Sequence, residues 1–201
     1  MSLWLLSEPL VLASKSAVRR AMLEAAGIPV EVSPADVDER ALEAAAGAVA
    51  PEEVALLLAN AKAAAVAARM PGRVVLGADQ TLSLGTRRFS KPIDRAAARL
   101  QLSALRGETH SLHSAAAAAR DDRMLLAAVD QAHLTMRPFS DAFVVRYLDQ
   151  VGAAVTASVG GYQLERLGVH LFEAITGDHF TILGLPLLRL LASFRQHGFV
   201  A

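Results

Sequence analysis

The chain contains no cysteine, which excludes disulfide bonds, thiolate metal sites and a cysteine nucleophile. Aromatic residues make up only 5% of its 201 residues, too few for a protein built on stacking surfaces, such as a binder of single-stranded nucleic acid. Charge of one sign is not in excess either, because 20 Lys and Arg balance 20 Asp and Glu. The chain as a whole therefore does not attract nucleic acid or an acidic membrane, and any anion site must be local.

Long uncharged stretches suited to a membrane are also missing. Residues 151–164 carry no charge, but the stretch is short and contains three glycines. The first sixteen residues begin apolar, yet they lack a basic segment and are interrupted by Glu8, so we do not interpret them as a signal peptide. We therefore expect a cytoplasmic protein with neither a nucleic-acid nor a membrane partner.

What the sequence does contain is an early alternation of short strands and helices, followed by hairpins. Apolar runs and hairpin patterns predict strands at 10–13, 30–32, 74–76, 82–84, 87–89, 109–119, 124–134, 171–175 and 180–183. Helical periodicity and caps predict helices at 16–26, 51–68, 94–105, 140–150 and 186–195. This order predicts an α/β fold with a mixed sheet. No repeat or linker divides residues 1–201, which we expect to form one domain or two small lobes around a cleft.

The first predicted helix carries two cations in an unusual place. In LASKSAVRRAML, residues 12–23, Arg19 and Arg20 fall in the first helical turn, where backbone N–H groups already carry partial positive charge. One interpretation is a pair of solvated arginines. The other is that the guanidinium groups, the helix N–H groups and the hydroxyls of Ser14 and Ser16 together bind a polyphosphate.

Carboxylates occur at two further places that suit phosphate chemistry. The loop SPADVDER, residues 33–40, is acidic and is either an exposed loop or a source of ligands such as Glu39 for Mg²⁺, which prefers one or two carboxylates plus substrate phosphates. Asp79 follows an apolar strand, where α/β proteins often place their sites. Lys62 and Lys91 are individually weak signals, although Pro92 stiffens the chain beside Lys91.

Other common site motifs are not found. The six histidines form no HExxH pattern, which makes a zinc site improbable. Neither a GxSxG motif nor a phosphate-binding Walker motif occurs, and Gly160-Gly161 is too short to predict a phosphate loop.

Taken together, LASKSAVRRAML, PADVDER, the Lys62 helix, VVLGADQTL, SKP and residues 160–187 resemble, in order and spacing, the Maf family of nucleoside triphosphate pyrophosphatases. The resemblance covers nearly the whole chain. It departs from the family pattern at Ala17, where the family usually has Pro, at Ser90, where it usually has Gly, and at Arg166, where it usually has Gly. The resemblance implies a two-lobed fold with a cleft, similar to the inosine triphosphatase architecture.

The resemblance also implies site residues and a cofactor. Phosphate-handling positions are matched by Ser14, Arg19, Arg20, Lys62 and Lys91, and positions of substrate choice by Gln80 and Glu165. Glu39 and Asp79 match its acidic catalytic positions, which are expected to hold a divalent cation, Mg²⁺ first and Mn²⁺ or Co²⁺ as alternatives. A homodimer is a further expectation.

Gln80 and Glu165 make the chain resemble the family branch that acts on 7-methyl-GTP. A carboxylate offers only acceptors, which suits the adjacent N–H and NH₂ groups of guanine and suits a cationic methylated guanine better still. Two alternatives stay open at this stage. One is a pyrophosphatase of dTTP or UTP, and the other is a nucleotide-binding regulator of cell division without turnover.

Overall fold

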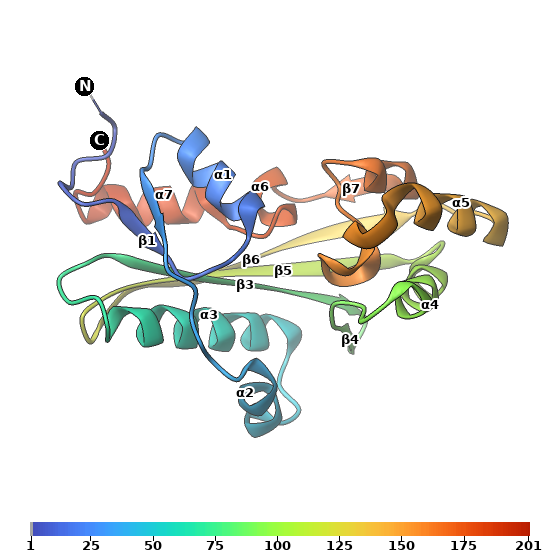
Figure 1. Ribbon diagram of the computed structural model, residues 1–201, viewed down its shortest axis with the longest axis horizontal. Coiled ribbons are helices and arrows are strands. Elements are labelled where there is room, and N and C mark those ends of the chain that lie inside the picture. The colour runs from blue at the N-terminus through green and yellow to red at the C-terminus, as the bar shows by residue number, and fades with distance from the viewer. Residues whose placement is uncertain (1) are drawn as a thin grey trace. The chain divides into compact units, whose positions relative to one another are not determined.

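A computed structural model describes residues 2–201 of the chain (Figure 1). Its strands are β1 (Leu10–Leu12), β2 (Val30–Val32), β3 (Val75–Leu84), β4 (Arg87–Phe89), β5 (Thr109–Arg120), β6 (Arg123–Met136) and β7 (Phe172–Thr176). Its α-helices are α1 (Ala17–Ala25), α2 (Glu39–Ala46), α3 (Pro51–Ala67), α4 (Arg95–Leu105), α5 (Asp141–Val151), α6 (His179–Ile182) and α7 (Leu187–Gln196). Three 3₁₀ helices follow α5, namely η1 (Gly152–Thr156), η2 (Val159–Gly161) and η3 (Leu167–Leu171).

The strands join in one mixed sheet, which confirms the predicted α/β class. Their order is β2-β1-β3-β5-β6-β7, and β4 pairs with β3. Strand β1 runs parallel to both β2 and β3, with Leu12 opposite Val32 and Leu76. The hairpin partner β4 and the pair β6–β7 are antiparallel.

The chain divides into two compact units. Unit 1 comprises the chain up to Gln80, His113–Asp130 and His179–Ala201, and unit 2 comprises Thr81–Leu112 and Gln131–Asp178. The long strands β3, β5 and β6 each contribute residues to both units. Two compact units agree with the expectation of two lobes, and the assignment of residues 1–201 to a single domain stays a prediction.

In unit 1 the sheet is covered on both faces, and side-chain alternation along β3 decides which residues face which helices. Leu76 and Ala78 belong to an apolar cluster that includes residues of α1 and α7, among them Leu23 and Phe194. Val75 faces the other way, into a cluster formed with the alanines of α3. Figure 1 shows α1 and α7 on one side of the strands and α3 on the other.

Unit 2 is built around a group of buried rings and hydroxyls. The hydroxyl of Tyr162 lies 2.7 Å from Nε2 of His110, and the ring of Phe172 packs edge-on against Tyr162. The Tyr147 hydroxyl donates a hydrogen bond to the carbonyl of Gly161. These contacts hold the 3₁₀ helices that follow α5.

Two predictions of secondary structure are wrong. Residues 180–183 were expected to be a strand, but His179–Ile182 form the short helix α6, because a brief apolar run does not distinguish a strand from a helical turn. Asp79 was expected to follow a strand that ends at Leu76, but β3 continues to Leu84, so Asp79 lies within it. Across residues 2–201, the helices are all too short or too polar to cross a membrane.

Candidate active site

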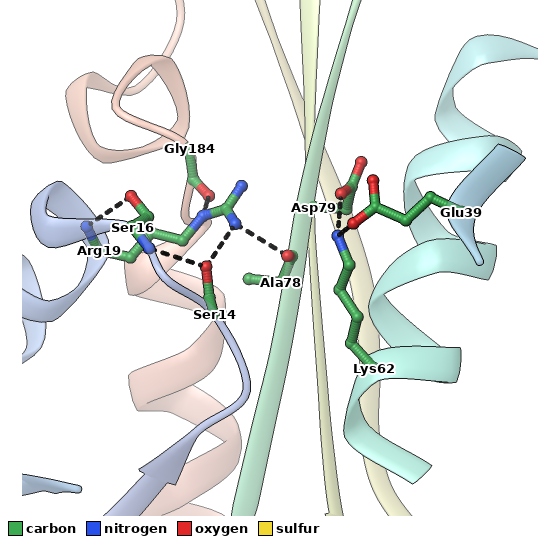
Figure 2. A network of polar contacts seen from close by, with 8 residues as sticks. All are labelled: Ser14, Ser16, Arg19, Glu39, Lys62, Ala78, Asp79 and Gly184. Atoms are coloured by element: carbon green, nitrogen blue, oxygen red, sulfur yellow. Dashed lines mark hydrogen bonds and ion pairs between the residues drawn. The ribbon is translucent and has the colours of Figure 1, made fainter. Parts of the chain in front are cut away.

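The N-terminus of α1 is built around Arg19. Ser16 caps the helix, with its hydroxyl accepting the Arg19 backbone N–H at 3.3 Å. The Arg19 side chain turns back toward β3: Nε donates to the Gly184 carbonyl at 2.8 Å, and Nη1 donates to the Ala78 carbonyl at 2.8 Å and to the Ser14 hydroxyl at 3.1 Å (Figure 2). Neutral carbonyl and hydroxyl oxygens therefore hold the Arg19 guanidinium in place.

Arg20 points elsewhere, although it is the next residue. Its Nε donates to the Glu24 carboxylate at 2.7 Å, a solvent-exposed pair one helical turn apart. Such exposed pairs contribute little to stability, about 0.3–0.5 kcal/mol. The two arginines thus differ. Arg19 contacts oxygens of Ser14, Ala78 and Gly184, and within residues 2–201 no carboxylate touches its guanidinium. Arg20, in contrast, pairs with Glu24.

Three charged side chains meet on the opposite side of β3. The Lys62 ammonium lies 2.6 Å from Oδ1 of Asp79 and 2.8 Å from Oε1 of Glu39 (Figure 2). The side chains of Lys62 and Asp79 are only 11% and 13% exposed, whereas that of Glu39 is 50% exposed. We call Lys62, Asp79 and Glu39 the ion triad.

Each member of the ion triad is positioned by its own element. Glu39 begins α2, whose N-cap is Asp38, with a side chain that accepts the Ala41 N–H at 3.0 Å. Asp79 points toward α3 because it shares the face of β3 that carries Val75. Lys62 lies on α3 beside buried alanines, which let that helix pack close to the strand.

Gly77 makes this close approach possible. A Cβ atom at Gly77 would lie 2.1 Å from the Ala59 carbonyl oxygen and 2.6 Å from the Ala63 nitrogen, both of them backbone atoms of α3. No other residue type fits such a contact without moving the helix. Gly77 therefore fixes the separation of α3 and β3, and with it the contact between Lys62 and Asp79.

Burial and neighbouring charges act in opposite directions on this group. Burial raises the pKa of the Asp79 carboxyl, and the nearby Lys62 and Arg19 oppose that rise. Burial likewise lowers the pKa of the Arg19 guanidinium, against the attraction of Asp79 and Glu39. A buried carboxylate with a raised pKa and cations around it is suited to accept a proton in a reaction on an anion.

Gln80 is held by unit 1 through its amide nitrogen. Nε2 donates to the Ser114 hydroxyl at 3.0 Å and to the carbonyls of Thr181 and Ile182 at 3.2 and 3.0 Å. Ser114 in turn donates to the Thr181 carbonyl at 2.6 Å. We call Gln80 and Ser114 the brace, because they tie β3 and β5 to α6 just before Gly184. Because the N–H groups of its amide are already hydrogen-bonded, Gln80 can offer a ligand only its amide oxygen, as an acceptor.

The structure places Ser14, Arg19, Glu39, Lys62, Asp79 and Gln80 in unit 1, with Arg19 in contact with Ser14 and Lys62 in contact with Glu39 and Asp79. Lys91 and Glu165 belong to unit 2, and both are exposed. Their predicted roles in binding stay predictions, as does that of Arg20. Arg166, the departure from the family pattern, is exposed beside Glu165.

Sequence reasoning missed Ser114, Gly77 and the carbonyl of Gly184. Ser114 stands in an alanine-rich strand with no motif around it, so nothing marked it as a contact of Gln80. Gly77 was not singled out by the sequence, although its packing fixes the position of α3. The Gly-Leu-Pro sequence at 184–186 was the one available signal of a turn after α6, which ends at Ile182.

Comparisons with known proteins agree with the geometry. The model of a family described as Maf-like protein matches residues 9–197. Two proteins of Rhodopseudomonas palustris strains, both named nucleoside triphosphate pyrophosphatase, are 54% and 56% identical over the full length of both chains. A protein of Mesorhizobium japonicum named 7-methyl-GTP pyrophosphatase is 54% identical over 96% of this chain and 98% of its own.

Among solved structures, a nucleoside-triphosphatase (dITP/XTP pyrophosphatase) from Mycobacterium abscessus aligns over 95% of both chains. Its TM-score is 0.44 and its sequence identity is 16%. This degree of likeness is too low to carry an argument, so the predicted inosine triphosphatase architecture stays a prediction.

Proposed function

The chain belongs to the Maf-like protein family, and we propose that it hydrolyses a nucleoside triphosphate to the monophosphate and pyrophosphate. The observation that carries the proposal is the ion triad, in which buried Lys62 and Asp79 meet next to Glu39. Burying ionised groups costs free energy, so their presence calls for a functional reason. Binding a triphosphate is such a reason, because it uses both cations and carboxylates.

The residues of unit 1 take two roles in this reaction, phosphate binding and proton transfer. Arg19 and Lys62 supply positive charge for the phosphate oxygens, because the Arg19 contacts leave its charge uncompensated by a direct carboxylate contact. Water attacks the α-phosphorus, the bond from that phosphorus to the bridging oxygen breaks, and pyrophosphate leaves. The proton that the water loses passes to the Asp79 carboxylate, whose raised pKa suits a general base.

The donor set of the ion triad fits a divalent cation that arrives with phosphate. Mg²⁺ usually takes one or two carboxylates and completes its shell with waters and substrate phosphates, and Glu39 and Asp79 are two such carboxylates. We therefore propose Mg²⁺, with Mn²⁺ or Co²⁺ as alternatives, held by Glu39 and Asp79. When bound, such a cation neutralises negative charge on the phosphates.

For the base, we propose 7-methyl-GTP. The supporting observations are the name of the Mesorhizobium japonicum relative and the acceptors available here. Gln80 donates from its amide nitrogen to Ser114 and to the Thr181 carbonyl and so offers only its oxygen, and Glu165 is a carboxylate, so each residue taken by itself suits a base that presents N–H groups. Uracil and thymine present one N–H between two carbonyls and match this set less well.

Release of pyrophosphate from a nucleotide panel tests the proposal. The panel contains 7-methyl-GTP, GTP, dTTP, UTP, ATP and CTP, each assayed with Mg²⁺ and with a chelator. We expect Mg²⁺-dependent release that is fastest with 7-methyl-GTP. Fastest release from dTTP or UTP would favour the other family branch. Tight nucleotide binding without release from any substrate would favour the regulator of cell division.

Glu165→Gln tests the base preference separately. A missing partner at a polar contact to the base can cost as much as ~10⁴-fold in discrimination. We expect the ratio of kcat/KM for 7-methyl-GTP over UTP to fall in this variant, while Glu173→Gln, an exposed change in the same unit, leaves the ratio unchanged. An unchanged ratio in Glu165→Gln would refute the role of this carboxylate.

A further inference from the structure

The ion triad contains an internal competitor for the cation that its carboxylates are suited to hold. The Lys62 ammonium lies within 2.8 Å of an oxygen of both Glu39 and Asp79, so it occupies the space between the two carboxylates. A divalent cation placed beside it would meet a like charge at short range in a poorly solvated site, which is strongly unfavourable.

The rest of unit 1 offers such a cation no substitute. Within residues 2–201, no group of three or more Asp, Glu or His side chains is arranged to hold a metal ion. Two carboxylates whose charge is half compensated by a lysine form a weak site for a free dication, because Mg²⁺ and Mn²⁺ also need further oxygen ligands. The missing oxygens are those that a triphosphate brings.

The lysine can leave this position while its helix stays fixed. The backbone of α3 is held against β3 at Gly77, where no Cβ atom fits. The four-carbon stem of lysine, in contrast, contains several rotatable bonds and ends in a point charge that pairs equally well with phosphate oxygens. A triphosphate near the ion triad therefore gives the ammonium another anionic partner without any movement of the helix.

From these observations we propose that Lys62 is the protein's own counter-cation, which keeps free divalent cations away from Glu39 and Asp79 until a nucleotide draws the ammonium to its phosphates. This inference rests on the proposed function for its nucleotide step only. Its consequence is an order of binding. The cation enters with the nucleotide or after it, and the nucleotide-free protein has little affinity for the cation.

Titration with Mn²⁺ alone, at pH 8 and without nucleotide, tests the exclusion. Free Mn²⁺ is followed by electron paramagnetic resonance for the wild type, Lys62→Met and the matched control Lys15→Met, which removes an exposed lysine from unit 1. We expect Lys62→Met to bind Mn²⁺ at least about tenfold more tightly than the wild type, since a like charge at this distance outweighs that factor. Lys15→Met should behave as the wild type.

Further variants keep the result interpretable. The double variant Lys62→Met/Asp79→Asn should lose the increased affinity for Mn²⁺. An increase that persists in this variant would place the Mn²⁺ ion away from Asp79 and overturn the proposal. Equal affinities of the wild type and Lys62→Met would also overturn it. Lys62→Gln, checked by circular dichroism, replaces Lys62→Met if the latter does not fold.

The nucleotide step has its own readout. Addition of an α,β-methylene analogue of GTP to the wild type should bring Mn²⁺ onto the protein, measured as water-proton relaxation enhancement above that of Mn²⁺ and analogue alone. An analogue that binds without bringing Mn²⁺ would contradict the proposal. Failure of the analogue to bind at all would count against the proposed function, and the nucleotide-free comparison of wild type and Lys62→Met would still decide the exclusion.

Discussion

In unit 1, buried Lys62 and Asp79 form an ion pair, whereas in unit 2 buried His110 and Tyr162 share a hydrogen bond between neutral groups. Burial favours the neutral forms of Asp79, His110 and Tyr162. It raises the pKa values of Asp79 and of Tyr162, and it lowers the pKa of His110 to about 4. In unit 1, the positive charges of Lys62 and Arg19 oppose the effect of burial on the pKa of Asp79.

The comparison indicates different purposes for the two buried groups. A neutral pair of rings packed against Phe172 needs no ligand and stabilises the fold of unit 2 by burial and one hydrogen bond. A buried ion pair is a poor source of stability, because desolvation offsets much of its attraction. We therefore expect changes in the ion triad to act on chemistry and changes at His110 to act on stability.

Gly77→Ala is expected to have the largest effect, because it separates α3 from β3. The new methyl group would overlap backbone atoms of Ala59 and Ala63, and such overpacking costs about 3 kcal/mol or more of the free energy of unfolding. Because the contact between Lys62 and Asp79 depends on this packing, activity should fall as well. Chemical denaturation and a pyrophosphate assay measure both effects.

The control is Gly72→Ala, a glycine with positive φ and open space around it. This change introduces backbone strain but no overlap, at a cost of roughly 1 kcal/mol. If Gly77→Ala lowers the free energy of unfolding no more than Gly72→Ala does, then α3 does not need its close approach to β3.

Because His110 of unit 2 is buried, we expect the free energy of unfolding to depend on pH. The folded pKa of about 4 lies below the unfolded value of 6.5, so the unfolded chain binds a proton first as the pH falls. Stability should therefore decrease between pH 6.5 and pH 4, by about 3 kcal/mol in total from this group. His110→Gln, which can keep a bond to Tyr162, should lack this component in denaturation curves at a series of pH values.

His170→Gln, a change at an exposed histidine of the same unit, serves as the matched control and should keep the wild-type dependence. Parallel pH profiles for the wild type and His110→Gln would show that His110 is not held neutral by burial.

Ser114→Ala is expected to have a smaller effect, on the brace of unit 1. The change removes a buried hydroxyl that contacts both Gln80 and the Thr181 carbonyl, at a cost of about 1–2 kcal/mol in stability. Because the brace holds α6 just before Gly184, which accepts from Arg19, kcat/KM should fall by a similar factor for every nucleotide. The exposed Ser103→Ala is the control, and a loss confined to one base would indicate that Gln80 reads the base instead.

Sequence reasoning reached the fold class and the members of the ion triad, but not their contacts. Asp79 could be selected because it follows an apolar strand, and Glu39 because it lies in an acidic loop. The difference between Arg19 and Arg20 could not be predicted, since it depends on carbonyls of Ala78 and Gly184 that are distant in the sequence. Backbone acceptors leave no signal in side-chain patterns.

Gly77 and α6 illustrate the same limit. A glycine after an apolar run usually indicates a turn, and only the packed structure shows that this one lets a helix approach. Phe180 and Ile182 are apolar and suit a strand as well as a helix, so tertiary contacts decide between the two conformations.

The measurement that tests the central claim most directly is turnover against binding in Asp79→Asn. The variant keeps the size of the side chain but removes its charge and its ability to accept a proton. We expect pyrophosphate release to fall at least about 10²-fold, the contribution typical of a general base, while the dissociation constant of a non-hydrolysable triphosphate stays within a few-fold of the wild type. Near-normal release of pyrophosphate by this variant would contradict the assignment of Asp79 as the base.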